Sequence, residues 1–236
     1  KRLEQDDQSR QEFVSNVSHE LKTPLSSIKV LSESLLLQED VPAEMYREFL
    51  LDISSEIDRM TNIVNDLLAL VRNDPNEAKL NVTDIDVNKM LRDIVKRLSP
   101  LASDKNIDLS FQAAKDVVLM GDEVKLSLAV SNLVDNGIKY TPEGGYVKVM
   151  LDADSKDCFI TVQDSGIGIS EEEQTKVFER FYRVDKTRDR ETGGTGLGLA
   201  ITHSIIMLHN GSVKIISGKN EGATFIVRLP LERKEE

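Results

Sequence analysis

Two long apolar seams in the first 72 residues limit what this chain can fold into. The polar break QEDVPAE at 38–44 separates them, and apolar residues recur within each at intervals of about three and four, the spacing of long packed helices. We expect an antiparallel hairpin of helices at about 7–38 and 45–71. Each seam is broader than one partner helix can cover, so a dimeric four-helix bundle would bury both. The seams are Val14, Val17, Leu21, Leu25, Ile28, Leu31 and Leu35, then Met45, Phe49, Ile53, Ile57, Met60, Val64, Leu67 and Val71.

Shorter segments follow from about residue 82. Apolar alternation predicts strands at about 107–111, 117–120, 146–151, 158–163, 212–217 and 223–229, and longer periodic runs predict helices at about 87–101, 123–139 and 197–208. This order is typical of an α+β fold in which helices cover a mixed sheet. We therefore expect two domains, at 1–76 and 77–236, joined by the polar segment 72–84.

Composition excludes several classes of function. The chain has 236 residues and a net charge of -11, which disfavours nucleic acid as a partner. Its one cysteine, Cys158, lies in an apolar run, which suits a buried thiol in a reducing compartment, and with three histidines it forms no zinc-site spacing. No apolar run reaches the length of a membrane span, but the first residue is Lys1, as expected for part of a longer protein.

The segment 13–30, FVSNVSHELKTPLSSIKV, predicts an exposed histidine beside a helix irregularity. At about 100° per residue, His19 lies roughly 200° from Val17 and Leu21, so it faces away from the seam. Pro24 costs about 3 kcal/mol inside a helix, a penalty seldom accepted for packing alone. One interpretation is a bent helix that presents a nucleophilic imidazole next to a carboxylate. The alternative is a surface histidine near a kink.

A stripe of polar residues lies on the helix predicted at 123–139. Asn132, Asn136 and Lys139 recur on one face, and Tyr140 follows. Amide oxygens bind Mg²⁺ weakly, so an ion held by Asn136 would need phosphate oxygens to complete its coordination, and Lys139 would neutralise their charge. A solvated polar helix face is the alternative.

The segment DSGIGI at 164–169 ends an apolar strand. Gly166 and Gly168 stand where a side chain would block a close approach or a positive φ. A carboxylate repels phosphate, so Asp164 is better suited to accept a hydrogen bond from an exocyclic amine such as that of adenine. A plain turn is the alternative.

A second glycine run, at 193–198, opens the last predicted helix, where free amides and the helix dipole favour phosphate. Its spacing matches neither the dinucleotide-binding fingerprint nor a P-loop. The preceding segment 177–194 begins with Phe178 and Phe181 and is locally basic, which indicates a lid over phosphates, with a solvated loop as the alternative. Its basic residues include Arg183, Lys186, Arg188 and Arg190.

Taken together and in order, these motifs resemble those of a known family. SHELKTPL, NLVDNGIKY, DSGIGI, FERFYR and GTGLGL are similar to the histidine, asparagine, first glycine, phenylalanine and second glycine boxes of bacterial sensor histidine kinases of two-component systems. The resemblance covers about residues 10–230. It implies a dimerisation and histidine-phosphotransfer domain at 1–76, followed by a Bergerat-type α/β sandwich that binds ATP.

The resemblance also implies residue roles. His19 would be phosphorylated, Glu20 would be its base, and Thr23 would position water when phosphate is removed from the partner. Mg²⁺ would be held by Asn136 and Asn132. Nucleotide would be bound by Asn132, Asn136, Lys139, Tyr140, Asp164, Gly166, Gly168, Arg183, Gly194, Thr195, Gly196, Leu197, Gly198 and Thr224.

Two positions depart from the family pattern without removing a ligand atom. Gly137 stands where alanine is usual and Asp135 where glutamate is common. Gly137 would loosen its helix by about 1 kcal/mol.

The resemblance further implies partners and location. ATP and Mg²⁺ would be required, a homodimer would form through the hairpin, and the phosphate would pass to an aspartate of a response regulator. The chain would be the cytoplasmic portion of a protein anchored in the bacterial membrane through a segment outside it. Two alternatives stay open: an ATP-driven clamp like those of heat-shock or mismatch-repair proteins, against which the histidine box argues, and a scaffold or phosphatase that binds ATP without effective kinase activity.

Overall fold

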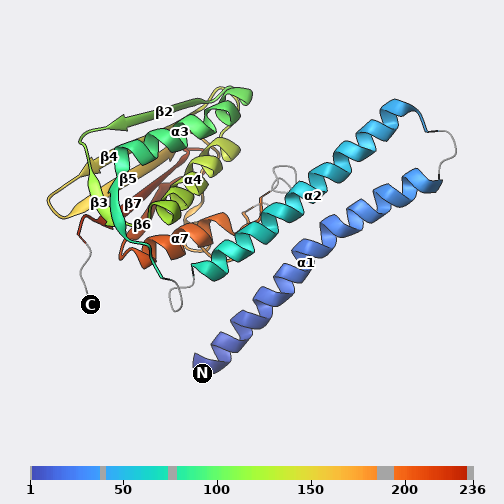
Figure 1. Cartoon of the computed structure of the whole chain (residues 1–236), viewed down its shortest axis with the longest axis horizontal. Helices are drawn as coiled ribbons and strands as arrows, with labels where there is room; N and C mark the ends of the chain where they lie inside the picture. Colours follow the sequence, from blue (N-terminus) through green and yellow to red (C-terminus); the bar gives the residue numbers. More distant parts are fainter. Residues whose placement is uncertain (1, 38–40, 74–78, 185–193, 233–236) are drawn as a thin grey trace. The chain divides into compact units, whose positions relative to one another are not determined.

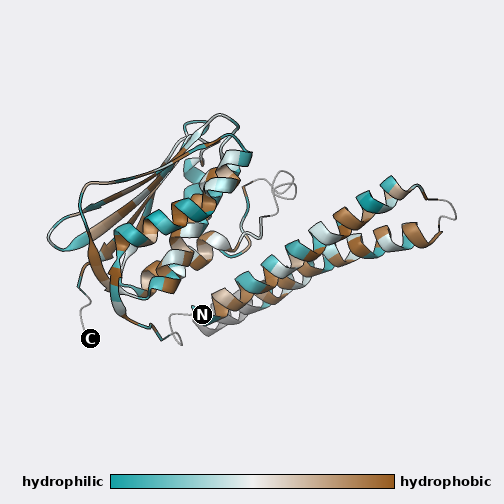
Figure 2. Cartoon of the chain, turned by 45° about the horizontal axis from the view of Figure 1, so that its top comes forward, coloured by the Kyte–Doolittle hydropathy of each residue, from teal (hydrophilic) through white to brown (hydrophobic). Residues whose placement is uncertain are grey.

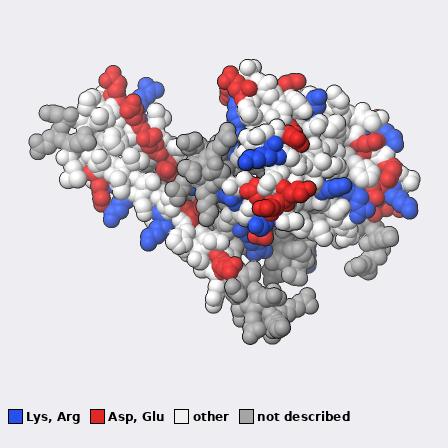
Figure 3. Space-filling model, turned by 180° about the vertical axis from the view of Figure 1, so that it is seen from behind, with Lys and Arg blue, Asp and Glu red and all other residues white. Residues whose placement is uncertain are grey.

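A computed structural model describes residues 2–37, 41–73, 79–184 and 194–232. The chain divides into two compact units, one made of Lys1–Ala69 with Gly193–Thr195 and the other of Leu70–Thr192 with Gly196–Glu236. No helix among the described residues is long and apolar enough to cross a membrane. On the face shown in Figure 3, acidic and basic side chains are interspersed over the second unit.

The first unit is a helical hairpin. Helix α1 spans Arg2–Leu37, and α2, which spans Ala43–Arg72, runs back antiparallel to it (Figure 1). The ends of both helices lie within a few residues of their predicted positions, except that α1 begins earlier than predicted, at Arg2. Pro24 is buried inside α1, and the helix continues through it.

The hairpin leaves much of its apolar surface uncovered. Hydrophobic and hydrophilic residues are interleaved along both helices (Figure 2). Ile63 is buried, but Leu25 is 57% exposed and Val64 is 44% exposed. Monomeric proteins rarely leave so many large apolar side chains in water, which agrees with seams broader than one partner helix. Further exposed apolar residues on the hairpin are Val14, Val30, Leu36, Leu37, Met45, Tyr46, Leu50, Leu51, Ile57, Leu68 and Val71.

The second unit is a two-layer α/β sandwich. Helices α3, α4 and α7 lie side by side over one face of a five-stranded sheet of order β2-β4-β5-β7-β6 (Figure 1). β2 and β4 pair in parallel and the other neighbouring strands of this sheet pair antiparallel, so the sheet is mixed, as predicted. The elements are β1 Thr83–Asp86, α3 Val87–Asp104, β2 Asp108–Ala113, β3 Val118–Gly121, α4 Glu123–Tyr140, β4 Tyr146–Ala153, β5 Asp157–Asp164, α5 Glu171–Gln174, α7 Gly198–Leu208, β6 Ser212–Ser217 and β7 Ala223–Pro230.

Strand β1 was not predicted. Its sequence TDID contains one apolar residue, Ile85, which is too little to give a strand periodicity. Tertiary pairing creates the strand, because β1 forms a separate two-stranded sheet with β3 and buries Ile85.

The core lies between the helices and the sheet. Leu126, Val130 and Leu133 of α4 are fully buried there. Cys158 of β5 is buried as expected, and burial raises the pKa of its thiol to about 12, so it is not a nucleophile at neutral pH.

The N-terminus of α4 is fixed by a buried hydrogen-bond network. Asp122 caps the helix by accepting from the Lys125 amide at 3.1 Å. The Asp122 amide in turn donates to Nε2 of His209 at 3.0 Å, and Nδ1 of His209 lies 2.8 Å from the Ile205 carbonyl oxygen. His209 therefore has a structural role, because both of its ring nitrogens have partners.

Candidate functional site

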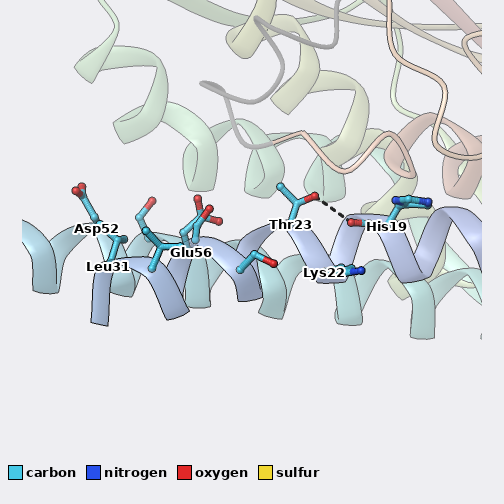
Figure 4. Close-up of a pocket in the computed structure, with 10 residues that line it drawn as sticks. His19, Lys22, Thr23, Leu31, Asp52 and Glu56 are labelled. Atoms are coloured by element: carbon cyan, nitrogen blue, oxygen red, sulfur yellow. Dashed lines mark hydrogen bonds between the residues drawn. The ribbon is translucent and has the colours of Figure 1, made fainter. Parts of the chain in front are cut away.

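The histidine motif lies on the outer surface of α1. His19 is exposed, as its helical position predicts. Thr23 is exposed on the same side one turn later, and its hydroxyl donates to the His19 carbonyl at 3.1 Å (Figure 4). An imidazole in this position is accessible to a second protein or domain.

A groove between α1 and α2 begins at His19 (Figure 4). Most of the residues that line it have polar side chains, including the carboxylates of Asp52 and Glu56 on α2. The groove is lined by His19, Lys22, Thr23, Ser26, Ser27, Val30, Leu31, Asp52, Ser55 and Glu56.

The predicted Asn stripe of α4 leads to the start of α7. Asn132, Asn136 and Lys139 are half-buried, whereas the opposite face of the helix is buried in the core. Nδ2 of Asn132 donates to the Gly198 carbonyl at 3.1 Å. The amide stripe and the second glycine run, which are 66 residues apart in sequence, are therefore neighbours.

The end of α4 is held by a lysine that the sequence did not reveal. Nζ of Lys105 donates to the Ile138 carbonyl at 2.9 Å and to the Lys139 carbonyl at 2.5 Å. A cation on these carbonyls satisfies the helix end and complements its dipole. Lys139 Nζ lies 5.3 Å from the centre of the Tyr140 ring.

Asp164 is a buried carboxylate at the end of β5, 7% exposed. Its Oδ1 accepts from the Gly166 amide at 2.8 Å and from the Ala223 amide at 3.2 Å. Burial raises the pKa of Asp164, although the two amide hydrogen bonds oppose this shift. A buried carboxylate acceptor of this kind can bind an amine donor such as the exocyclic amine of adenine.

Glycines allow the chain to fold closely around Asp164. A Cβ at Gly166 would lie 2.7 Å from Asp164 Oδ1 and 2.7 Å from the Tyr140 carbonyl oxygen. Gly168 has a φ of 68°, and a Cβ there would clash with the Gly218 carbonyl oxygen. Gly222, which sequence analysis did not single out, has a φ of 76°, and a Cβ would clash with the Asp164 carbonyl oxygen.

We expect Gly168→Ala to lower the free energy of unfolding by about 2 to 4 kcal/mol, the sum of left-handed strain and a backbone clash. Gly144→Ala is a matched control, because Gly144 has a φ of 79° and nothing within 4 Å of the new Cβ. That control should lose only about 1 kcal/mol. Urea unfolding followed by circular dichroism measures both, and equal losses would contradict a packing requirement at Gly168.

The second glycine motif is connected to the phenylalanine motif. The Phe181 amide donates to the Gly196 carbonyl at 2.9 Å. Phe181 and Gly196 both have positive φ, 63° and 71°. A bulky residue in this conformation is strained, and such strain concentrates at functional segments.

The structure describes most of the other predicted residues of these two motifs. Gly194 and Arg183 are half-buried, Thr195 and Leu197 are buried, and α7 begins at Gly198, one residue after its predicted start. The Phe178 ring contacts the ring of His203 on α7 in a tilted arrangement, with the two ring centres 5.4 Å apart, which gives that histidine a packing role. Gly193, Lys186, Arg188 and Arg190 lie outside the described residues.

Thr224 lies on β7 close to Asp164 in the structure. It is half-buried and pairs with Gln163 in the β5–β7 ladder, one residue from the amide that binds Asp164. The neighbouring Gly222–Ala223 backbone thus supplies the direct contact. The glycine in NEGATF is the sequence feature that could have indicated this contact.

The donors on α4 fit a cation that arrives with phosphate. Among the described residues no cluster of three or more His, Cys, Asp or Glu side chains could hold a metal. The half-buried amides of Asn132 and Asn136 offer neutral oxygens, which suit Mg²⁺ only when phosphate oxygens complete its coordination.

The predicted residues thus form two groups. His19, Glu20 and Thr23 belong to the first unit. The residues predicted to bind nucleotide, such as Asn132, Asp164 and Gly198, belong to the second unit, except Gly194 and Thr195, which the division assigns to the first.

Two family models match the chain in succession. Residues 9–76 match the His Kinase A (phospho-acceptor) domain, and residues 121–233 match the histidine kinase-, DNA gyrase B- and HSP90-like ATPase domain. His19 lies in the first match, and Asn136 and Asp164 lie in the second.

The chain is also similar to curated sensor kinases. It is 38% identical over 222 residues to the sensor-like histidine kinase SenX3 of Mycobacterium tuberculosis, covering 94% of this chain and 54% of SenX3. It is 40% identical over 232 residues to the phosphate regulon sensor protein PhoR of Pseudomonas aeruginosa, covering 95% of this chain and 51% of PhoR. The chain therefore spans about half the length of these relatives.

Solved structures share the fold. The histidine kinase ThkA, in complex with the response regulator protein TrrA, matches with a TM-score of 0.77 and 24% identity over 98% of this chain and 66% of that one. Full-length ShkA in complex with AMPPNP matches with a TM-score of 0.69 and 26% identity over 95% of this chain and 47% of that one. With both domain models matched in the order of the sequence motifs, the chain belongs to the sensor histidine kinases of bacterial two-component systems.

Proposed function

We propose that this chain is an ATP-dependent protein-histidine autokinase that phosphorylates His19 and passes the phosphate to an aspartate of a response regulator. The observation that carries the proposal is the exposed imidazole of His19, in a chain whose second unit holds a buried carboxylate acceptor, Asp164, in a fixed orientation. We assign the phosphotransfer domain to 1–76 and the ATP-binding domain to 77–236.

The proposed reaction is the transfer of the γ-phosphoryl group of ATP to His19. An imidazole nitrogen of His19 forms a bond to the γ-phosphorus while the bond from that phosphorus to the β–γ bridging oxygen breaks, so ADP leaves with the electron pair. The proton on the other ring nitrogen passes to Glu20. Because phosphoryl transfer depends mainly on positioning and charge stabilisation, the second domain must bring the phosphate in line with His19.

The nucleotide-binding roles follow from the chemistry of each side chain. Asp164 accepts the adenine amine and Tyr140 packs on the ring, while Lys139 and Arg183 neutralise phosphate charge. The backbone amides at Gly194, Gly196 and Gly198 bind phosphate at the N-terminus of α7, with Thr195 and Leu197 between them. Thr224 supports the adenine-binding carboxylate.

Mg²⁺ is proposed on the amides of Asn136 and Asn132. When bound with ATP, the ion would supply positive charge to the phosphates. The neutral amides of this chain orient it without a dedicated all-protein cage. The AMPPNP bound by ShkA supports a triphosphate ligand for this fold.

Two protein partners are proposed. A second copy of the chain would cover the exposed apolar residues of the hairpin, such as Leu25 and Val64, in a four-helix bundle. A response regulator would dock near His19, as the ThkA complex with TrrA supports, and Thr23 would position water when the chain removes phosphate from that regulator. Anchoring in the bacterial membrane, with this part in the cytoplasm, is proposed through a segment outside the chain.

The proposal is tested by the chemistry of the phosphate. After incubation with ATP and Mg²⁺, label on the protein should be labile to acid and stable to alkali, as expected for phosphohistidine. Asn136→Ala should lower labelling at least about 10-fold because both metal and nucleotide lose a ligand. Asn62→Ala, an exposed asparagine on α2, is the control and should label normally. Acid-stable label, or full labelling of Asn136→Ala, would refute these assignments.

A further inference from the structure

Arg59 of α2 lies between two carboxylates beside the histidine groove. Its Nη2 is 3.6 Å from Oε2 of Glu20 on α1, and its Nη1 is 4.0 Å from Oε2 of Glu56, one helical turn earlier on α2. The Arg59 side chain is only 13% exposed, and those of Glu20 and Glu56 are 27% and 26% exposed. Solvent therefore screens this cluster less than an ordinary surface pair.

The Arg59 guanidinium makes a close hydrogen bond with neither carboxylate. Both ion-pair distances exceed the range of a good hydrogen bond. Within the described part of the chain, buried Nε of Arg59 and buried Oε2 of Glu56 have no hydrogen-bond partner. Unmet buried groups are costly, so a shift of Arg59 toward either carboxylate would improve the hydrogen bonding of the cluster.

Movement of Arg59 toward Glu20 and movement toward Glu56 have opposite consequences for the Glu20 carboxylate. While Arg59 pairs with Glu20, the ion pair directs the Glu20 carboxylate toward α2. When Arg59 pairs with Glu56 instead, the Glu20 carboxylate can turn to His19, its neighbour in sequence. Glu56 also lines the groove that begins at His19, so the alternative pairing lies at the same site.

We propose that Arg59 is a positioning residue that restrains Glu20, and that Glu56 relieves this restraint by competing for the same guanidinium. The inference rests on the proposed function, in which Glu20 accepts the imidazole proton during autophosphorylation. The pair thereby sets how readily His19 is labelled, without contact with the nucleotide.

The test compares initial labelling rates in the full chain. Arg59→Met should raise the rate about 3- to 10-fold, the range expected for loss of one partly buried ion pair, with an unchanged KM for ATP. Glu56→Gln should lower it by about the same factor, since Arg59 then pairs with Glu20 alone. The double variant should match Arg59→Met, because Glu56 acts only through Arg59.

Controls separate this inference from the proposed function. Arg47→Met, an exposed arginine on the same helix, should label like the wild type. In a Glu20→Gln background, labelling should be slow and neither substitution should change it further. Three results would overturn the proposed restraint of Glu20: a lower labelling rate in Arg59→Met, a higher labelling rate in Glu56→Gln, or an equal effect of Glu56→Gln on the labelling rate with and without Arg59. Normal labelling of Glu20→Gln would instead overturn the role of Glu20 in the proposed function.

Discussion

Replacing His19 by alanine is expected to abolish labelling from ATP while nucleotide affinity stays within about twofold of the wild type, because His19 belongs to a different compact unit from most of the residues proposed to bind nucleotide, such as Asn136 and Asp164. The loss should be complete, since no other group can take the place of the attacking nitrogen. The fold should persist, because His19 is exposed and an exposed substitution changes the unfolding free energy by less than about 0.5 kcal/mol.

The measurement is retention of phosphate on the protein, paired with titration of ATP by calorimetry. Ser18→Ala is a matched control, because Ser18 is the adjacent exposed residue and its hydroxyl already donates to the Val14 carbonyl at 2.8 Å. It should label fully. Residual label on His19→Ala that matches the wild type would refute the phosphorylation site, and loss of ATP binding in that variant would show that the two units are coupled in a way not proposed.

Periodic and local features were predictable from the sequence. The helices of the hairpin follow from long seams with repeated spacing, and the exposure of His19 follows from its angle to Val17 and Leu21. The polar stripe that includes Asn132 was predicted in the same way. In each case the relevant neighbours lie within a few turns of one helix, so spacing alone determines which side they share.

Contacts between distant segments were not predictable in this way. Glu20 and Arg59 meet only because the hairpin has a particular register, and Lys105 reaches the end of α4 from a different element. The amides that bind Asp164 Oδ1 come from Gly166, nearby in sequence, and from Ala223, which β7 brings alongside β5. Strand β1 likewise depends on its partner β3. Such contacts depend on tertiary pairing, which a single sequence does not specify by spacing.

The roles proposed for individual nucleotide-binding residues have a different origin. The resemblance to the kinase family suggested them, and the structure adds a physical reason for some. Asp164 is the strongest of these, because it is buried and its Oδ1 is already held by two backbone amides. Its orientation is therefore fixed independently of any bound ligand.

Asp164→Asn is expected to weaken ATP binding at least about 100-fold, because an amide nitrogen would replace the free carboxylate oxygen and meet the adenine amine donor to donor. Oδ1 of asparagine can still accept from the Gly166 and Ala223 amides, so the local backbone should hold. Calorimetric titration with ATP measures the effect. Asp157→Asn, at the other end of the same strand and paired with Arg228 at 3.2 Å, is the control and should bind normally.

Asp164→Asn should weaken ATP binding without lowering the stability of the fold at pH 7. Measuring both therefore separates loss of a ligand contact from loss of the fold. Burial raises the pKa of Asp164 above its ordinary value of 3.8, so the folded chain binds this proton more tightly than the unfolded chain does. The stability contributed by protonation is fully present below pH 3.8 and is lost as the pH rises through the raised pKa. Asparagine carries no such proton. Near pH 7 the variant should therefore unfold at a urea concentration equal to or higher than the wild type, and its advantage should shrink as the pH falls toward 3.8. A variant that binds no ATP and is also less stable at pH 7 would show that the carboxylate supports the fold, and its assignment to adenine recognition would then lose its main support.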